Sequence, residues 1–283
     1  MIKGGRLLKK PEMGIEISPS GGADSFWGDL WKYRELFVFL TWRDILARYK
    51  QTTIGVAWSV LRPLVTMFAF TLVFSRLAGL SAGDTPYPLM VFSALLPWQF
   101  FSVSLTESGN SLVNNSQLVT KVYFPRIIVP GSSVAVGLVD FLISMVVYVA
   151  LMLFYRYVPD WRVVTLPLFL LLAIAATLGL GFWLSALTVK YRDFRHVLPF
   201  LVQVGLYVSP VGFRSDIVPA QWRLIYSLNP MVGVIDGFRW ALLGGKTPLY
   251  LPGIGLSVAL TLAVLWGGLR YFRRTEQIFA DVI

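Results

Sequence analysis

This chain of 283 residues is 56% hydrophobic, 15% aromatic and only 14% charged, whereas about a quarter of the residues in a typical soluble domain are charged. The composition therefore excludes an ordinary soluble domain and predicts an integral membrane protein. The net charge of +10 is better explained by basic loops at a membrane surface than by a nucleic-acid partner, and the absence of cysteine excludes disulfides, thiolate metal sites and cysteine nucleophiles.

The N-terminal segment is expected to lie in the cytosol. Residues 1–25 are partly basic but contain no apolar run of the kind that follows the basic start of a signal peptide. They predict a flexible cytosolic tail without a fold of its own. The remainder, residues 26–283, is predicted to form one transmembrane domain.

The first element of that domain is predicted to lie on the membrane rather than to cross it. Residues 26–51 are aromatic and basic, and their apolar side chains recur at roughly helical spacing, which is typical of an amphipathic interfacial helix. The apolar face of this helix would carry Trp31, Val38, Trp42, Ile45, Leu46 and Tyr49.

Six stretches are apolar enough to be considered as membrane spans, since a spanning helix needs about 20 mostly apolar residues. They are residues 56–78, 86–107, 129–154, 163–188, 196–213 and 248–269, of which the fifth is the shortest. The sequence therefore predicts an all-α membrane protein with six transmembrane helices.

The distribution of basic residues predicts how these helices are oriented. With the N-terminus inside, the inner segments carry seventeen Lys and Arg residues and the outer segments carry seven, although nine of the seventeen belong to the N-terminal segment. An excess of Lys and Arg marks the cytoplasmic side. Both termini are therefore expected in the cytosol.

The connection between the second and third spans is then cytosolic. Its sequence, NSLVNNSQLVTKVYFPRIIVP at residues 110–130, is rich in amides and then turns basic. Asn110 or Ser111 would cap the start of a helix and Pro125 would end it. A short helix parallel to the membrane is expected here.

The connection between the fifth and sixth spans, residues 214–246, is expected on the outer side. It is too apolar for a solvated loop, and Pro219, Pro230 and Gly233 interrupt it too often for a span. Two short re-entrant helices separated at Asn229–Pro230 would satisfy its backbone, provided that they pack on protein.

The sequence offers little catalytic chemistry. The GGKTP motif at residues 244–248 lacks the first glycine of a phosphate loop, because position 240 is Trp, so ATP would have to bind to a partner. His196 is a single histidine without a ligand set, and neither catalytic nor metal-binding residues are expected. A membrane-embedded glycosyltransferase or acyltransferase remains an alternative, although no convincing set of catalytic carboxylates or histidines supports it.

Three ionisable residues in the predicted spans have more than one possible role. Asp140 lies near the middle of the third span, where a carboxylate is either a functional group such as a proton relay or a structural partner of another helix. Glu107 and Arg62 lie toward the inner ends of their helices and could pair with each other, and their role is either structural or contact with a substrate. Aromatic side chains form interfacial belts or line a path for sugars, and Trp98 to Phe101 lie too deep in the second span for a belt.

Four motifs together resemble those of a known family. SALLPWQFFS (93–102), the segment 110–130, RDFRHVLPFLVQVGLYVSPV (192–211) and LNPMVGVIDGFRWALLGG (228–245) are similar to, and in the same order as, those of type 2 ABC exporter permeases of bacterial polysaccharides, which export O-antigen, capsule or teichoic acid. The resemblance implies a permease for lipid-linked polysaccharide, most simply O-antigen, in the bacterial inner membrane. It also implies a homodimer with two ABC ATPase subunits that bind ATP and Mg.

The resemblance also implies roles for individual residues. An ATPase-coupling helix would use Asn115, Gln117, Lys121, Tyr123, Phe124 and Arg126; an interface helix would use Trp31, Trp42, Arg43 and Arg48; the channel would be lined by Trp98, Phe100, Phe101 and Tyr207; and an outer gate would contain Trp222, Tyr226, Asn229, Pro230 and Arg239. The alternative within transport is a type 2 ABC exporter of drugs or small lipids. The aromatic content and the YFPR motif favour the polymer.

Overall fold

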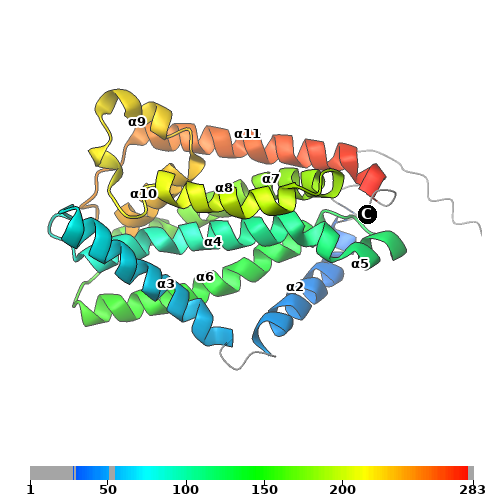
Figure 1. Cartoon of the computed structure of the whole chain (residues 1–283), viewed down its shortest axis with the longest axis horizontal. Helices are drawn as coiled ribbons and strands as arrows, with labels where there is room; N and C mark the ends of the chain where they lie inside the picture. Colours follow the sequence, from blue (N-terminus) through cyan, green and yellow to red (C-terminus); the bar gives the residue numbers. More distant parts are fainter. Residues whose placement is uncertain (1–27, 29, 51–54, 280–283) are drawn as a thin grey trace, which may run out of the picture.

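The computed structural model describes residues 28, 30–50 and 55–279, and these residues form helices and no strand (Figure 1). The all-α fold class is therefore confirmed for the described part of the chain. The expected tail, residues 1–25, lies outside the described residues.

The helices follow one another with short connections. In chain order they are α2 (Arg34–Tyr49), α3 (Gly55–Phe70) continued by the π-helical η1 (Thr71–Leu77), α4 (Tyr87–Asn114), α5 (Ser116–Lys121), α6 (Ile128–Phe154), the 3₁₀ turn η2 (Trp161–Thr165), α7 (Leu166–Lys190), α8 (Phe194–Val208), the 3₁₀ turn η3 (Ser215–Ile217), α9 (Ala220–Tyr226), α10 (Pro230–Leu242), α11 (Leu251–Thr275) and the 3₁₀ turn η4 (Glu276–Ile278).

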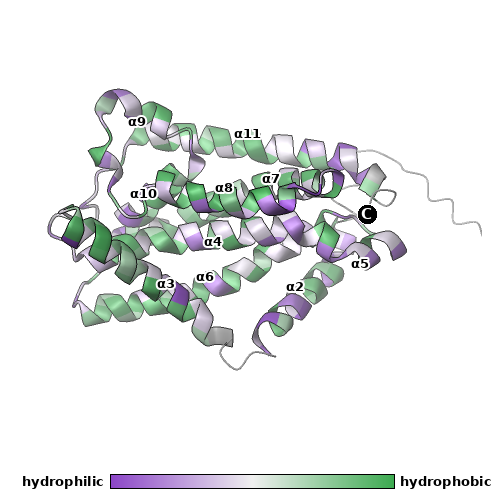
Figure 2. Cartoon of the chain, viewed as in Figure 1, coloured by the Kyte–Doolittle hydropathy of each residue, from purple (hydrophilic) through white to green (hydrophobic). Residues whose placement is uncertain are grey.

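Helix α4 is the centre of the bundle. It contacts α3, α6, α7, α8 and α10, and 78% of the residues in its most apolar stretch are buried within the chain, against 6% for α3. Figure 1 shows α5 and the end of α11 at one end of the bundle and α9 at the other. Hydrophilic residues gather on α2 and α5 and at the ends of the long helices (Figure 2).

Five helices of the described chain are long and apolar enough to cross a membrane. They are Ala57–Leu77, Tyr87–Asn114, Ile128–Phe154, Trp161–Lys190 and Leu251–Thr275, which correspond to the first, second, third, fourth and sixth predicted spans.

The fifth predicted span, residues 196–213, corresponds to the shorter helix α8, which has 15 residues. Its length of about 22 Å is less than the roughly 30 Å of a hydrocarbon core. The helix ends at Val208 because Ser209 precedes Pro210 and takes an extended conformation, as a residue before proline prefers.

The prediction that a cytosolic helix starts at Asn110 or Ser111 is wrong. Both residues lie inside α4, where Asn110 Nδ2 donates to the Thr106 carbonyl at 3.0 Å and Ser111 Oγ donates to the Ser108 carbonyl at 2.7 Å. Side chains that bond to their own preceding turn do not act as N-caps. Helix α4 therefore extends well past residue 107, where the second span was expected to end.

The short helix α5 is also bounded differently from the prediction. It contains only six residues, and it ends at Lys121, before Pro125, because Val122 is already extended. The segment from Val122 to Pro125 is thus a connection between α5 and α6, which begins at Ile128.

Helices α7 and α11 pack with their backbones in close contact. A Cβ atom on Gly268 would lie 2.2 Å from the Gly179 carbonyl oxygen, and a Cβ atom on Gly179 would lie 2.7 Å from the Leu265 nitrogen. Small residues at such crossings are a common means of helix association in membranes, where the apolar lipid leaves no hydrophobic driving force between helices.

This contact predicts that replacing Gly268 with alanine destabilises the protein. Alanine usually favours a helix over glycine, but here its methyl group requires α7 and α11 to separate, and overpacking typically costs about 1–3 kcal/mol. The matched control is Gly255→Ala on the same helix, where an added Cβ meets nothing within 4 Å. Thermal unfolding of the purified variants should show a lower midpoint for the first variant only, and equal midpoints would contradict the tight crossing.

Candidate functional site

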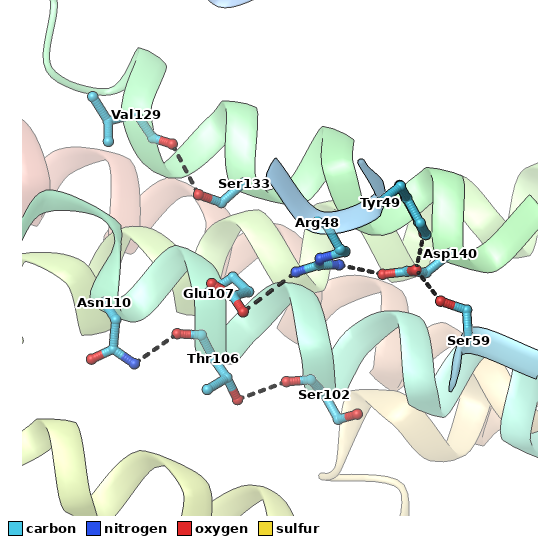
Figure 3. Close-up of polar contacts among 10 residues, drawn as sticks. All are labelled: Arg48, Tyr49, Ser59, Ser102, Thr106, Glu107, Asn110, Val129, Ser133 and Asp140. Atoms are coloured by element: carbon cyan, nitrogen blue, oxygen red, sulfur yellow. Dashed lines mark hydrogen bonds and ion pairs between the residues drawn. The ribbon is translucent and has the colours of Figure 1, made fainter. Parts of the chain in front are cut away.

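Asp140 on α6 is the centre of a polar network that joins three helices (Figure 3). Its carboxylate forms an ion pair with Arg48 and accepts a hydrogen bond from the hydroxyl of Tyr49, both on α2, and it accepts a bond from Ser59 Oγ on α3 at 3.0 Å. Burial raises the pKa of Tyr49 to about 12, and its hydrogen bond to Asp140 acts in the same direction. These contacts fit the structural one of the two roles considered for Asp140, that of a partner of other helices.

The same network reaches α4 through Glu107, but not as the sequence suggested. The sequence allowed a pair of Glu107 with Arg62, whereas in the structure the Glu107 carboxylate lies 3.4 Å from Arg48 Nη2. Arg48 of the amphipathic helix α2 thus contacts acidic side chains of α4 and α6. Sequence reasoning missed the contributions of Tyr49 and Ser59, because neither residue type signals a role without its partner in space.

A cleft of about 650 Å³ lies beside this network, between α3, α4 and α6. Its charged lining residues are Arg48, Arg62, Glu107 and Asp140, and its remaining lining includes Trp58, Leu61, Val65, Gln99 and Phe100. The cleft therefore combines charges of both signs with apolar and aromatic walls, as ligand sites of this size commonly do.

The expected ATPase-coupling residues divide into an exposed and a buried set. Gln117, Lys121 and Tyr123 are exposed at the same end of the bundle as the end of α11, and Tyr123 is 73% exposed. Asn115, in contrast, serves the chain itself: its side chain accepts a hydrogen bond from Arg43 of α2 at 2.7 Å and donates to the Ser111 carbonyl.

Phe124 and Arg126 were expected to contact a partner, but the structure uses both within the chain. Phe124 is only 4% exposed and belongs to a core at this end of the bundle with residues of α2, α4, α7 and α11. The Arg126 backbone N–H donates to Glu276 Oε1 at 2.7 Å, and its guanidinium donates to the Glu276 carbonyl oxygen. Burial raises the pKa of the Glu276 carboxyl, although the Arg126 backbone N–H opposes the shift.

Besides Arg43, an arginine that the sequence did not suggest also holds the turn before α5. Arg195, at the start of α8, donates from Nη2 to Asn114 Oδ1 at 3.1 Å. Together with Arg43, it ties the beginning of α5 to two helices that are distant in the sequence. The position of α5 is therefore determined by α2, α8 and the end of α11.

Helix α2 has the two faces expected of an interfacial helix. Leu40 is fully buried against the bundle, whereas Val38 and Trp42, together with Trp31 just before the helix, are each more than half exposed. Large exposed apolar side chains on one face of a surface helix fit contact with the lipid–water interface.

The aromatic residues of α4 lie in the protein core. Trp98, Phe100 and Phe101 are 4%, 2% and 7% exposed, and the Trp98 and Phe101 rings contact each other at 5.6 Å. In this conformation Trp98 and Phe101 face other helices of the same chain rather than an open path. Tyr207 on α8, in contrast, is largely exposed and lies 6.5 Å from the Phe70 ring.

The segment between α8 and α11 contains two short helices, α9 and α10, which meet at Asn229–Pro230. Pro230 is the first residue of α10, and Asn229 caps it by accepting a hydrogen bond from the Met231 N–H at 3.0 Å. The Tyr226 hydroxyl donates to the Val208 carbonyl at 2.9 Å and so ties α9 to the end of α8, whereas Trp222 is exposed.

Arg239 of the expected outer gate is almost completely buried. Its guanidinium donates to the carbonyl oxygens of Met90, Phe213 and Val211, at 3.3, 2.7 and 2.8 Å. Bonds to three carbonyl groups make Arg239 an anchor between α10, α4 and the segment after α8, because a buried cation requires such partners. In this conformation the Arg239 side chain therefore does not contact an exposed gating surface.

Comparison with known proteins agrees with the resemblance seen in the motifs. Residues 35–243 match the ABC-2 type transporter family. The chain is 28% identical to an O-antigen export system permease protein of Myxococcus xanthus over 90% of this chain and 98% of the relative, and 28% identical to one of Klebsiella pneumoniae over 88% and 95%. It is 25% identical to a polysialic acid transport protein of Escherichia coli over 83% and 91%. The chain therefore belongs to the ABC-2 type transporter family.

Proposed function

We propose that this chain is the permease subunit of an ATP-driven exporter that moves lipid-linked polysaccharide, most simply O-antigen, across the bacterial inner membrane. The observation that carries the proposal is the similarity, over 83% to 90% of the chain, to permeases whose names state export of O-antigen or transport of polysialic acid. The chain itself provides passage, and a separate ABC ATPase provides ATP hydrolysis.

The site supports docking of that ATPase on α5. Gln117 and Lys121 on α5 and Tyr123 just after it present an exposed amide, a cation and an aromatic ring. Exposed aromatic side chains beside polar groups are common in protein interfaces. ATP and Mg would bind to the partner, whose movement would be transmitted through α5 to α4 and α6.

The exposed side chains of α8 support a homodimer. Helix α8 exposes Phe200, Leu201, Val204 and Tyr207 on its surface. In the proposed dimer a path wide enough for a hydrated polymer lies between two copies, with Tyr207 among its lining residues. Two copies of the permease would accompany two copies of the ATPase.

The proposed topology has six crossings with both termini in the cytosol. Helix α8 is too short to span by itself, so the outer part of the fifth crossing would be completed by the segment after Val208, with α9 and α10 entering the membrane from the outer side and returning. The ties of Tyr226 and Arg239 to the end of α8 support this arrangement.

Labelling of single cysteines tests the re-entrant segment, because the native chain has none. Trp222 and Lys246 are both exposed in the isolated chain. A cysteine at position 222 should react poorly with a membrane-impermeant thiol reagent because lipid or a second copy covers it, whereas a cysteine at position 246 should react readily. Equal, strong labelling at both positions would mean an ordinary solvated loop.

Deletion of the gene in its host tests the function itself. Lipid-linked polysaccharide should accumulate on the inner side of the membrane while surface polysaccharide disappears, and the wild-type gene should restore it. Unchanged surface polysaccharide, together with altered resistance to drugs or altered export of a small lipid, would favour the other branch of the family.

A further inference from the structure

The cleft between α3, α4 and α6 contains charged side chains that other groups of the described chain do not fully compensate. Asp140 is held by Arg48, Tyr49 and Ser59, and its charge is compensated within the network. The other two charged lining residues are Arg62 and Glu107, and both are exposed.

Arg62 lies within the apolar stretch of α3 without an ionic partner. It is about 8 Å along the helix axis from Ala57, where that stretch begins. Within the residues that the structure describes, its side chain forms no ion pair. A cation at this depth of a bilayer is costly unless an anion reaches it, and the anions available at that depth are lipid phosphates.

Glu107 faces the same cleft from α4, about 10 Å along the axis from Asn114, where that helix ends. The Glu107 side chain is 50% exposed. Its carboxylate lies 3.4 Å from Arg48, which is longer than an optimal charged hydrogen bond, and Arg48 also pairs with Asp140. Glu107 can therefore accept a further cationic donor. The four charged residues of the cleft sum to zero, which does not favour a ligand with a large net charge.

The walls beside these charges suit an alkyl chain. Trp58 is one helical turn before Arg62, and Leu61, Val65 and Phe68 of α3 are exposed, which extends an apolar strip from the charged end of the cleft toward the membrane interior. A volume of about 650 Å³ lies in the range of pockets that hold a small organic ligand.

We propose that this cleft binds a zwitterionic aminophospholipid of the inner leaflet. Arg62 binds the phosphate, Glu107 accepts hydrogen bonds from the primary ammonium group, and the acyl chains lie along the exposed apolar strip of α3. The proposal concerns a structural membrane lipid and does not depend on the substrate that the permease exports, since an undecaprenyl-pyrophosphate head would be purely anionic.

Native mass spectrometry of the purified full-length chain, titrated with phosphatidylethanolamine, phosphatidylcholine or phosphatidylglycerol, tests the proposal. Phosphatidylethanolamine should bind best, because the quaternary ammonium of phosphatidylcholine has no N–H to donate. Arg62→Gln and Glu107→Gln should each weaken its binding about tenfold, the factor expected for loss of one charge-assisted hydrogen bond. Arg76→Gln, at the other end of the same helical stretch, should leave binding unchanged.

The response of Glu107→Gln separates the possible occupants. If the cleft holds an anionic lipid or a pyrophosphate head, removing the negative charge strengthens binding of phosphatidylglycerol, and the proposal is overturned. Equal binding of phosphatidylethanolamine by the wild type and both Gln variants also overturns the proposal. A disulfide-linked dimer formed by Val65→Cys overturns it too, because it would show that a second copy covers the strip. Recovery of binding in the exchanged pair Arg62→Glu/Glu107→Arg would support it even if one single variant is unstable.

Discussion

Replacing Asp140 with alanine should destabilise this protein more than any other single change in the polar network. The substitution leaves the Arg48 guanidinium without its carboxylate partner, and it removes the acceptor for the hydroxyl groups of Tyr49 and Ser59. Removing one partner of a buried ion pair typically costs about 3–5 kcal/mol. The side chains of Arg48 and Asp140 are 27% and 20% exposed, so the lower end of this range is expected.

A double variant separates loss of the pair from loss of packing. Arg48→Leu with Asp140→Leu removes both charges, and its unfolding midpoint should be higher than that of either single variant, because neither charge is then left without a partner. Glu35→Ala, an exposed acid on α2, is the control for an unrelated carboxylate. Thermal unfolding of the purified proteins provides the measurement, and an Asp140→Ala midpoint no lower than that of the control would refute the structural role.

Phe124→Asp and Tyr123→Asp should give opposite outcomes although the residues are neighbours. Phe124 is 4% exposed in the core that joins α5 to α11, whereas Tyr123 is 73% exposed. Loss of a buried aromatic side chain costs about 3–5 kcal/mol, and burial of a carboxylate adds to that cost. The Phe124 variant should therefore be nearly absent from the membrane.

The Tyr123 variant, in contrast, should be present at the wild-type level but fail in export. Its carboxylate lies on the surface proposed to contact the ATPase, where a charge without a partner weakens an interface. Immunoblots of membranes report the amount of each variant, and surface polysaccharide reports export. Normal export by Tyr123→Asp at a normal protein level would exclude this residue from the coupling surface, and a normal amount of Phe124→Asp would contradict the described core.

The main features of the helices were predictable because they depend on local sequence. The free energy of placing a helix in a membrane is approximately a sum over about 20 consecutive residues, so the apolar runs located five of the helices. Their ends agree to within a few residues, except where α4 continues to Asn114 and α11 continues to Thr275. The start of α10 was predictable for the same reason, since Asn229 and Pro230 determine the cap within two residues. The motifs, compared as a set, indicated the family.

Other features depended on which helices lie together, and the sequence could not supply them. Arg48 and Asp140 are 92 positions apart, and Arg126 and Glu276 are 150 apart, so no local pattern links either pair. Apolar periodicity does not separate Phe124 or Trp98 from lipid-facing residues, because lipid tails are as apolar as the side chains of a protein core. By itself the sequence determined a helical membrane protein of the ABC-2 type, and only the tertiary structure decided which of its aromatic and charged side chains remain available to lipid, substrate or a partner.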